Sequence, residues 1–510
     1  MRREEVFALA ALMLLAFYAR TRYIVGFGLG DDALYAGTSY GFLKEGFKYL
    51  SVAYAPTYRL GIYIPVSRSF RILGVNDFAY TLFPLLASTL LVLVVYLIGR
   101  ELAGPEAGFF AGLIQAVSAF DLTFASTMTI DIPTTFFLSL GILFFLKAEK
   151  AEGMKNIVLN FFSAFCTLWA YYIKIPALSI ILVYMTLSAF KRKQWRKHLT
   201  MYLSLGLLLS AAFTLDYRLA GDPFYRIKGE VVAGPIPNTL ENLWREYPRW
   251  MFTKDNWLGS YIFGPHFFLT AFAAIFCLAE KKLREKVTPA AAWLAVTFLF
   301  LEFAPLSLQL PLKVSFRFFR YAYAFVPPAS LISGAALAWL YLHWASRTDK
   351  TGKRLPNWRT ALFLVLVLLH STVSISQGLD LAKRYVDHYN DPRYAVRYIA
   401  SLPPKPVYGD YIFLDRFNFE TGYERIGDTR WDVNGVGTNI IVKDKDVSRL
   451  RNIKRGYVVF GGARGMDASP EWVLQMGSFK PPKRWRLIYE DDKPLDANRW
   501  EPLRVYSIGD

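Results

Sequence analysis

Cysteine is almost absent from this 510-residue chain, and its two cysteines, Cys166 and Cys277, both lie inside apolar runs. There they act as small hydrophobic side chains, so neither a disulfide scaffold nor a paired zinc site is predicted. The chain also lacks an internal repeat, a low-complexity tract and an inverted pair of interrupted apolar segments, which counts against a secondary transporter. Gly461 and Gly462 fall short of a nucleotide-binding glycine motif, so we interpret them as a turn.

Apolar side chains are abundant instead. Hydrophobic residues make up 54% of the chain and aromatic residues 17%, too much for a soluble enzyme of this length. The apolar runs that suggest membrane spans include residues 80–99, 107–120, 157–173, 199–215 and 361–375. We predict a polytopic α-helical membrane protein with about eleven transmembrane helices. The first apolar segment is expected to be an uncleaved helix, because apolar residues resume after Arg20 and Arg22.

Lysine and arginine residues set the predicted orientation. They concentrate in alternate connections, among them residues 191–197, 281–286 and 347–359, and are sparse in the short turns between. By the positive-inside rule, the N-terminus is cytoplasmic and the C-terminal region lies outside, in a bacterial or archaeal cell membrane. This placement accounts for much of the net charge of +18, with membrane lipid as a partner, so nucleic acid is not required as one.

Three external regions are long enough to carry chemistry. The first loop, residues 27–77, contains two amphipathic pieces expected to lie along the membrane surface. The second, residues 217–260, is rich in aromatic residues, which suit either a cover over a sugar-binding cleft or an interfacial belt. After the transmembrane domain, residues 1–376, the pattern becomes polar and mixed, which predicts a soluble extracytoplasmic α/β domain over residues 377–510. Within it a helix is predicted over residues 392–402 and strands over residues 407–413 and 457–460.

Several carboxylates are predicted at the outer ends of the spans, where charge is costly enough to suggest function. Asp31 and Asp32 follow the first span and Asp131 opens the fourth, so all three are expected to face one external cleft. Asp131 could instead be a helix N-cap, with Pro133 just inside the helix. Asp121, at the outer end of the third span, is a further candidate, although we interpret it as a loop carboxylate.

Cations are predicted on the same face. Lys174 occupies a turn between the fifth and sixth spans, and Arg317 and Arg320 precede the tenth. A carboxylate base with membrane-level cations suits a reaction on a lipid-linked phosphate, because the cations hold the phosphate and stabilise the charge it gains on leaving. The alternative is that these long side chains merely reach the interface. His266, before the eighth span, is a candidate ligand for a divalent metal.

Several segments resemble motifs of the multi-spanning GT-C glycosyltransferases, in the branch of the dolichyl-phosphate-mannose protein mannosyltransferases and the lipid A aminoarabinose transferase. Asp-Asp-Ala-Leu-Tyr-Ala at residues 31–36 is similar to the acidic motif of the family's first external loop. Residues 96–104 look like the segment that closes its second span. Asp131 matches the acid that opens its fourth span. Residues 174–176 and 320–328 resemble its Lys-Gly-Pro and Arg-Tyr-x-x-Pro-x-x-Pro stretches.

The resemblance implies transfer of a single sugar, mannose or a related hexose, from a polyprenyl or dolichyl phosphate to a protein, glycan or lipid acceptor, with inversion at the anomeric carbon. Asp31 is then expected to be the base, while Asp32 and Asp131 orient it or bind acceptor or metal. Lys174, Arg320, Arg317 and Tyr321 would bind the donor phosphate. Tyr35 and Arg59 are candidates for acceptor contacts from the first loop.

The sequence also departs from the family pattern. Asp32 stands where the family has glutamate, and Pro56-Thr57-Tyr58 replaces Pro-Pro-Leu. Oligosaccharyltransferases should carry Trp-Trp-Asp-Tyr-Gly in the external domain, where this chain has only Trp431-Asp432-Val433-Asn434-Gly435. Two alternatives stay open: a transporter or flippase of a lipid-linked sugar, and an oligosaccharyltransferase-like enzyme.

Overall fold

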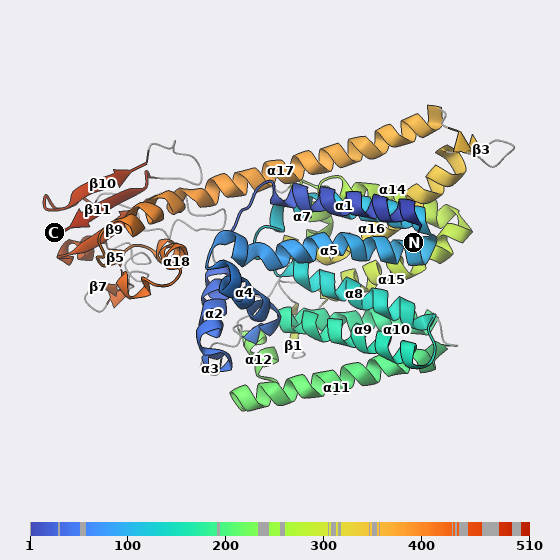
Figure 1. The fold of residues 1–510 in the computed structure, drawn as a ribbon, viewed down its shortest axis with the longest axis horizontal. Coiled ribbons are helices and arrows are strands. Elements are labelled where there is room, and N and C mark those ends of the chain that lie inside the picture. Colours follow the sequence, from blue (N-terminus) through green and yellow to red (C-terminus); the bar gives the residue numbers. More distant parts are fainter. Residues whose placement is uncertain are drawn as a thin grey trace. The chain divides into compact units, whose positions relative to one another are not determined.

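The computed structural model is mainly helical, with a small sheet near the C-terminus (Figure 1). It describes residues 2–28, 31–50, 58–190, 194–232, 244–254, 261–303, 305–307, 313–314, 318–345, 347–348, 354–355, 358–430, 432–433, 436–437, 447–461, 479–491 and 501–509. The chain divides into two compact units. The first consists of Met1–Arg22, Phe47–Ile62 and Phe83–Leu381, and the second of Tyr23–Gly46, Tyr63–Leu82 and Ala382–Asp510.

Helices build the first unit. They are α1 (Arg3–Thr21), α3 (Phe47–Leu50), the larger part of α5 (Asp77–Ala103), α6 (Pro105–Ala116), α7 (Ala119–Phe124), α8 (Asp131–Glu149), α9 (Gly153–Ile173), η2 (Ile175–Ser179), α10 (Ile180–Phe190), α11 (Trp195–Ala220), α12 (Tyr225–Val232), α13 (Glu246–Phe252), α14 (His266–Ala279), α15 (Lys281–Phe303), η5 (Phe319–Phe325), α16 (Val326–Leu340), η6 (Tyr341–Ala345) and the first part of α17 (Trp358–Ser401). Short strand pairs join β1 (Pro305–Ser307) to β2 (Lys313–Val314) and β3 (Arg347–Thr348) to β4 (Arg354–Leu355).

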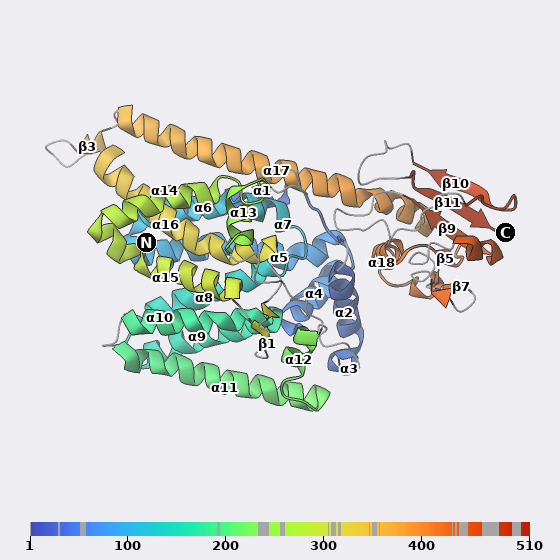
Figure 2. The ribbon, with the colours of Figure 1, turned by 180° about the vertical axis from the view of Figure 1, so that it is seen from behind.

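Close helix contacts hold this unit together. Helix α9 packs between α8 and α11, and α16 packs against α6, α14 and α15, as the two opposite views show (Figures 1 and 2). At the α6–α16 crossing a Cβ on Gly334 would lie 2.4 Å from the Ala111 nitrogen. Only glycine fits so close an approach, and small residues serve this purpose between membrane helices, where lipid supplies no hydrophobic drive for helices to associate.

Seven described helices are long and apolar enough to cross a membrane, and α14 and the pair η2–α10 are shorter apolar helices. The membrane-protein fold predicted from the sequence is therefore confirmed. The span predicted over residues 107–120 is wrong, because α6 stops at Ala116 and Ser118 caps α7 by accepting the Asp121 amide. Twelve residues cover only about 18 Å of a hydrocarbon core of about 30 Å.

A five-stranded sheet forms the core of the second unit. Its order is β10 (Arg486–Glu490), β11 (Arg504–Ile508), β9 (Gly456–Phe460), β5 (Val407–Tyr408) and β6 (Thr429–Arg430), with β5 parallel to both of its neighbours and the other pairs antiparallel. Alternate residues of β9 face opposite sides. Tyr457 and Val459 meet the end of α17 and helix α18 (Tyr411–Glu420), while Val458 and Phe460 meet η8 (Val447–Asn452) and Trp485. The unit also contains η7 (Ile426–Asp428) and the pair β7 (Asp432–Val433) and β8 (Val436–Gly437).

Two early segments join this unit through ion pairs. They carry α2 (Asp31–Glu45), most of α4 (Leu60–Leu73) and the start of α5. Arg416 donates to the Phe27 carbonyl at 2.6 Å and lies 3.1 Å from Asp77, which also pairs with Arg393 at 3.0 Å. The first loop, predicted as two amphipathic pieces, contains the three helices α2, α3 and α4; their placement along the membrane surface stays a prediction.

One helix and two strands were predicted for the C-terminal region. The helix predicted over residues 392–402 is confirmed as the last part of α17, which runs unbroken from Trp358 to Ser401 through the predicted domain boundary at residue 376. A strand was expected over residues 407–413, but β5 ends at Tyr408 because Asp410 caps α18 by accepting the Phe413 amide at 2.9 Å. The strand predicted over residues 457–460 is confirmed as part of β9.

Candidate functional site

A cluster of four predicted residues forms in the first unit where α8 begins. The Lys174 ammonium lies 2.5 Å from Asp131 Oδ1, and Arg320 Nε lies 3.8 Å from Asp131 Oδ2. The ammonium also lies 3.6 Å from the centroid of the Tyr321 ring. The cluster thus places two cationic groups around one carboxylate.

Local structure explains why these side chains meet. Helix α9 ends at Ile173, and Lys174 is its C-cap in an extended conformation, with Pro176 in the 3-10 turn η2 that follows. Arg320 and Tyr321 belong to η5, which enters α16 through prolines near its start. Asp131 is the first residue of α8, but its N-cap is Ile130 and no side chain caps the helix. The N-cap interpretation of Asp131 is therefore wrong: the carboxylate binds the cations instead.

The cluster borders apolar surface. A narrow pocket of about 50 Å³ is lined by Asp131, Lys174 and Tyr321 at one end and by Leu138, Ile180, Trp293 and Leu301 further along α8, α10 and α15. The Asp131 and Lys174 side chains are 7% and 15% exposed, and Arg320 is 33% exposed. The site therefore combines partly desolvated charge with an apolar wall, which is the surface that an amphiphile with an anionic head would fit.

A buried polar network holds η5 in place. Asp121, which was predicted to be a loop carboxylate, is fully buried and pairs with Arg20 at 3.6 Å. The Tyr323 hydroxyl donates to Asp121 at 2.6 Å, and Ser88 and Gln115 also donate to it. That prediction is wrong because α1, α5, α6, α7 and η5 enclose the group. Tyr323 follows Arg320 and Tyr321 in the same turn, so this network positions the cluster.

The two acids of α2 differ in exposure, and both belong to the second unit. Asp32 is buried and accepts the Gly28 amide at 2.6 Å, while its carbonyl accepts the Tyr80 hydroxyl at 3.0 Å. Asp31 is exposed at the first turn of α2, 3.5 Å from the hydroxyl of the buried Tyr35. The chain thus fixes Asp32 and leaves the carboxylate of Asp31 open to solvent.

The remaining predicted residues are less informative. Arg59 is half-buried just before α4, and Arg317 lies outside the described residues. His266 is buried, 3.4 Å from the Ser330 hydroxyl. Across the described part of the chain, no three histidine, cysteine, aspartate or glutamate side chains are grouped so that they could hold a metal ion. The sequence analysis did not single out Asp216 or Arg226, which are both buried and are considered below.

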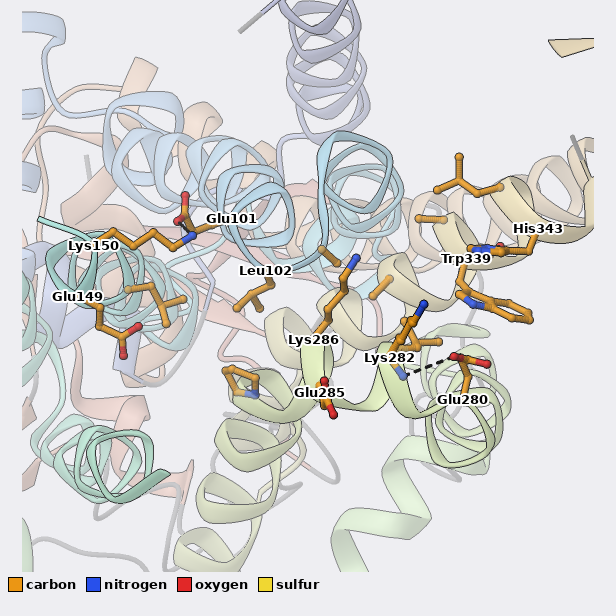
Figure 3. Close-up of a pocket in the computed structure, with 17 residues that line it drawn as sticks. Glu101, Leu102, Glu149, Lys150, Glu280, Lys282, Glu285, Lys286, Trp339 and His343 are labelled. Carbon is orange, nitrogen blue, oxygen red and sulfur yellow. Dashed lines mark hydrogen bonds and ion pairs between the residues drawn. The ribbon is translucent and has the colours of Figure 1, made fainter. Parts of the chain in front are cut away.

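Another pocket, of about 780 Å³, lies at the opposite end of α8, where the helix finishes at Glu149. Figure 3 shows the charged side chains that line it: Glu101, Glu149, Glu280, Glu285, Lys150, Lys282 and Lys286. Lys150 pairs with Glu101 at 2.5 Å, and the Lys282 amide donates to Glu280 at 3.4 Å. Four carboxylates face three ammonium groups, so this pocket offers no excess positive charge to a phosphate.

Comparison with known proteins relates the chain to one fold. Residues 65–215 match the family model of the dolichyl-phosphate-mannose-protein mannosyltransferases. The structure of ArnT from Cupriavidus metallidurans bound to undecaprenyl phosphate is similar over 98% of this chain and 97% of that one, with a TM-score of 0.60 and 14% identity. The chain has the GT-C fold. The resemblance drawn from the sequence motifs is therefore confirmed.

Other GT-C structures are also similar. The oligosaccharyltransferase of Archaeoglobus fulgidus in its apo form matches with a TM-score of 0.58 and 13% identity, over 90% of this chain and 69% of that one. The mycobacterial arabinofuranosyltransferase AftD matches with a TM-score of 0.54 and 12% identity, over 100% of this chain and 42% of that one. A search of curated protein sequences found no match.

Proposed function

We propose that this protein is an inverting glycosyltransferase that moves a single sugar from a polyprenyl phosphate to an acceptor on the outer face of the membrane. The observation that carries the proposal is the cluster of Lys174, Arg320 and Asp131, which places two cationic side chains beside an apolar pocket. Lys174 and Arg320 can hold the phosphate by charge-assisted hydrogen bonds while the prenyl chain follows the apolar wall. Tyr321 fixes the ammonium from the side.

The chemistry is a direct displacement. The acceptor oxygen attacks the anomeric carbon, and the bond from that carbon to the phosphate oxygen breaks, so the phosphate leaves with the electron pair. The acceptor proton passes to a base, and the two cations stabilise the charge that develops on the phosphate. A phosphate needs no acid catalyst to leave, so one carboxylate base is sufficient.

We assign Asp31 as that base. Its carboxylate is exposed, whereas Asp32 is buried and accepts the Gly28 amide. A general base must be able to reach a bound acceptor, which suits the exposed carboxylate. Asp32 then positions the start of α2, and Asp131 holds Lys174 and Arg320. The donor sugar is mannose or a related hexose, in keeping with the family model over residues 65–215.

The test reconstitutes the purified protein in liposomes with a polyprenyl-phosphate mannose and a membrane extract as acceptor, and follows the donor by mass spectrometry. Wild type should consume the donor, and Asp31→Asn should lower kcat by roughly 10²- to 10⁴-fold with the donor KM little changed, because a base is lost but no donor contact. The matched control is Glu45→Gln, which removes an exposed acid from the other end of α2 and should leave kcat unchanged. A fully active Asp31→Asn would refute the base, and a donor that changes leaflet intact would refute the reaction.

The two alternatives give different products. A flippase would line a pathway with ionisable groups at mid-depth, but residues 132–146 of α8 carry no charged side chain between Asp131 and Lys147. An oligosaccharyltransferase would transfer a preformed glycan, and its fold is similar to this one. The mass added to the acceptor separates the cases: one hexose supports the proposal, and a longer glycan contradicts it.

A further inference from the structure

A second buried polar cluster lies in the first unit, near the end of α9. It contains Asp216 on α11, which is 1% exposed, and Arg226 on α12, which is 2% exposed. Arg226 Nη2 donates to the Tyr171 carbonyl at 3.0 Å. Its guanidinium lies 4.5 Å from the centroid of the Tyr171 ring and 4.8 Å from that of Tyr172. These contacts fix the guanidinium against α9.

Several polar atoms of this cluster lack a hydrogen-bond partner. Among the described residues, both carboxylate oxygens of Asp216, Nη1 of Arg226 and the hydroxyl of Tyr171 have no hydrogen-bond partner. A buried polar atom without a hydrogen-bond partner is destabilising, and more so when it is charged. Native proteins rarely keep several together unless water or a ligand satisfies them. The cluster is thus built to receive a group that both donates and accepts hydrogen bonds.

The chemistry of the three residues selects the ligand. An ionised carboxylate only accepts hydrogen bonds and a guanidinium only donates them. A phosphate would meet repulsion from Asp216, and an apolar group would leave every atom unsatisfied. Hydroxyl groups satisfy both charges at once, because each one donates and accepts. A sugar presents several such hydroxyls on a rigid ring.

The cluster and the proposed phosphate site lie at the same end of α9. Tyr171 lies three residues before Lys174, and the Lys174 amide donates to the Ala170 carbonyl at 2.8 Å, so both belong to the same end of α9. In a polyprenyl-phosphate sugar the ring is joined directly to the phosphate. We propose that Asp216, Arg226 and Tyr171 form the subsite that binds the hydroxyls of the donor sugar. This inference rests on the proposed function, because it needs a sugar-bearing lipid phosphate at Lys174.

The test compares two lipids with the full-length protein in detergent: undecaprenyl phosphate without a sugar, and the same lipid phosphate carrying mannose. Asp216→Ala should weaken binding of the mannosyl lipid roughly 10- to 100-fold, through the loss of hydrogen bonds to a charged group. It should leave binding of the bare lipid within about three-fold of wild type, since Lys174 and Arg320 are intact. Unchanged binding of the bare lipid also shows that the variant is folded.

Two further variants sharpen the comparison. Asp216→Asn removes the charge but keeps one acceptor, so its loss should be smaller than that of Asp216→Ala. Asp222→Asn is the matched control, because this nearby acid pairs with Lys228 at 2.6 Å and is partly exposed. It should change neither affinity.

The other outcomes overturn the inference. Equal loss of both lipids in Asp216→Ala would assign the cluster to the phosphate or to folding, and no loss of either would mean that water alone satisfies it. If wild type binds both lipids with the same affinity, the subsite is refuted and the proposed function still stands. Wild type that binds neither lipid refutes the proposed function and the subsite with it.

Discussion

Replacing Lys174 with glutamine separates two roles for the Lys174–Asp131 pair. If the ammonium binds the lipid phosphate, Lys174→Gln should lower affinity for undecaprenyl phosphate. A hydrogen bond to a charged group contributes about 1.5–3 kcal/mol, so the expected loss is about 10- to 150-fold in Kd. The measurement is binding of the labelled lipid to purified protein in nanodiscs.

Asp131→Asn is the informative partner, because it breaks the same ion pair from the other side. In the wild-type cluster one carboxylate pairs with two cations, and the variant keeps the cations without that carboxylate. Phosphate affinity should therefore hold or rise, even though the ion pair is gone. Only Lys174→Gln is thus expected to lose affinity, although each variant removes the same contact.

Both variants should also unfold more easily. The Asp131 and Lys174 side chains are 7% and 15% exposed, and leaving one member of a buried pair alone costs about 3–5 kcal/mol, less where solvent screens it. A lower melting temperature in both variants is thus expected whatever the role of the pair. The reasoning fails if both variants melt earlier and neither changes lipid affinity, because the pair would then be purely structural.

Two further predictions concern stability. Arg20→Met should destabilise the first unit by roughly 3–5 kcal/mol, because it leaves the buried Asp121 carboxylate without its cation. The same change at the exposed Arg22 should have little effect on stability. Thermal unfolding in detergent measures both variants, and equal shifts in melting temperature would contradict the network. Burial and the nearby Asp410 raise the pKa of Asp415 to about 7. The native state therefore holds the proton of Asp415 more tightly than the unfolded state, so the stability that this group contributes is fully present below about pH 4 and is lost as the pH rises through about 7. Asp415→Asn should remove that slope in hydrogen exchange of α18, and a persisting slope would assign it to another group.

Sequence patterns were enough to find the cluster of Asp131, Lys174, Arg320 and Tyr321. Apolar runs fixed which connections share a membrane face, and charged residues at those ends are costly enough to be informative. Four residues far apart in the chain could therefore be assigned to one side without knowing their distances. The same reasoning predicted the membrane fold, and the motifs predicted its class.

The pattern could not show which polar residues are enclosed. Arg20 bonds the Ala116 carbonyl 96 residues away, and Tyr323 bonds Asp121 across 202 residues. Burial of this kind depends on which helices pack together, and an aspartate looks the same in the sequence whether a loop or a helix bundle surrounds it. The run of hydropathy also gave wrong ends for two helices. Helix α6 stops early at Ala116 because of local capping, and α17 continues through Gln377 although the apolar run has ended.

What the sequence by itself determined is the class of the protein: a helical membrane protein with acids and cations at the ends of its apolar segments. These follow from the cost of burying charge and backbone in lipid, which acts on each segment separately. Only the tertiary structure decided that Asp131 binds cations rather than capping α8, that Asp121 anchors η5, and that Asp216 and Arg226 are buried with polar atoms that lack hydrogen-bond partners. Those properties belong to pairs of segments, so packing alone creates them.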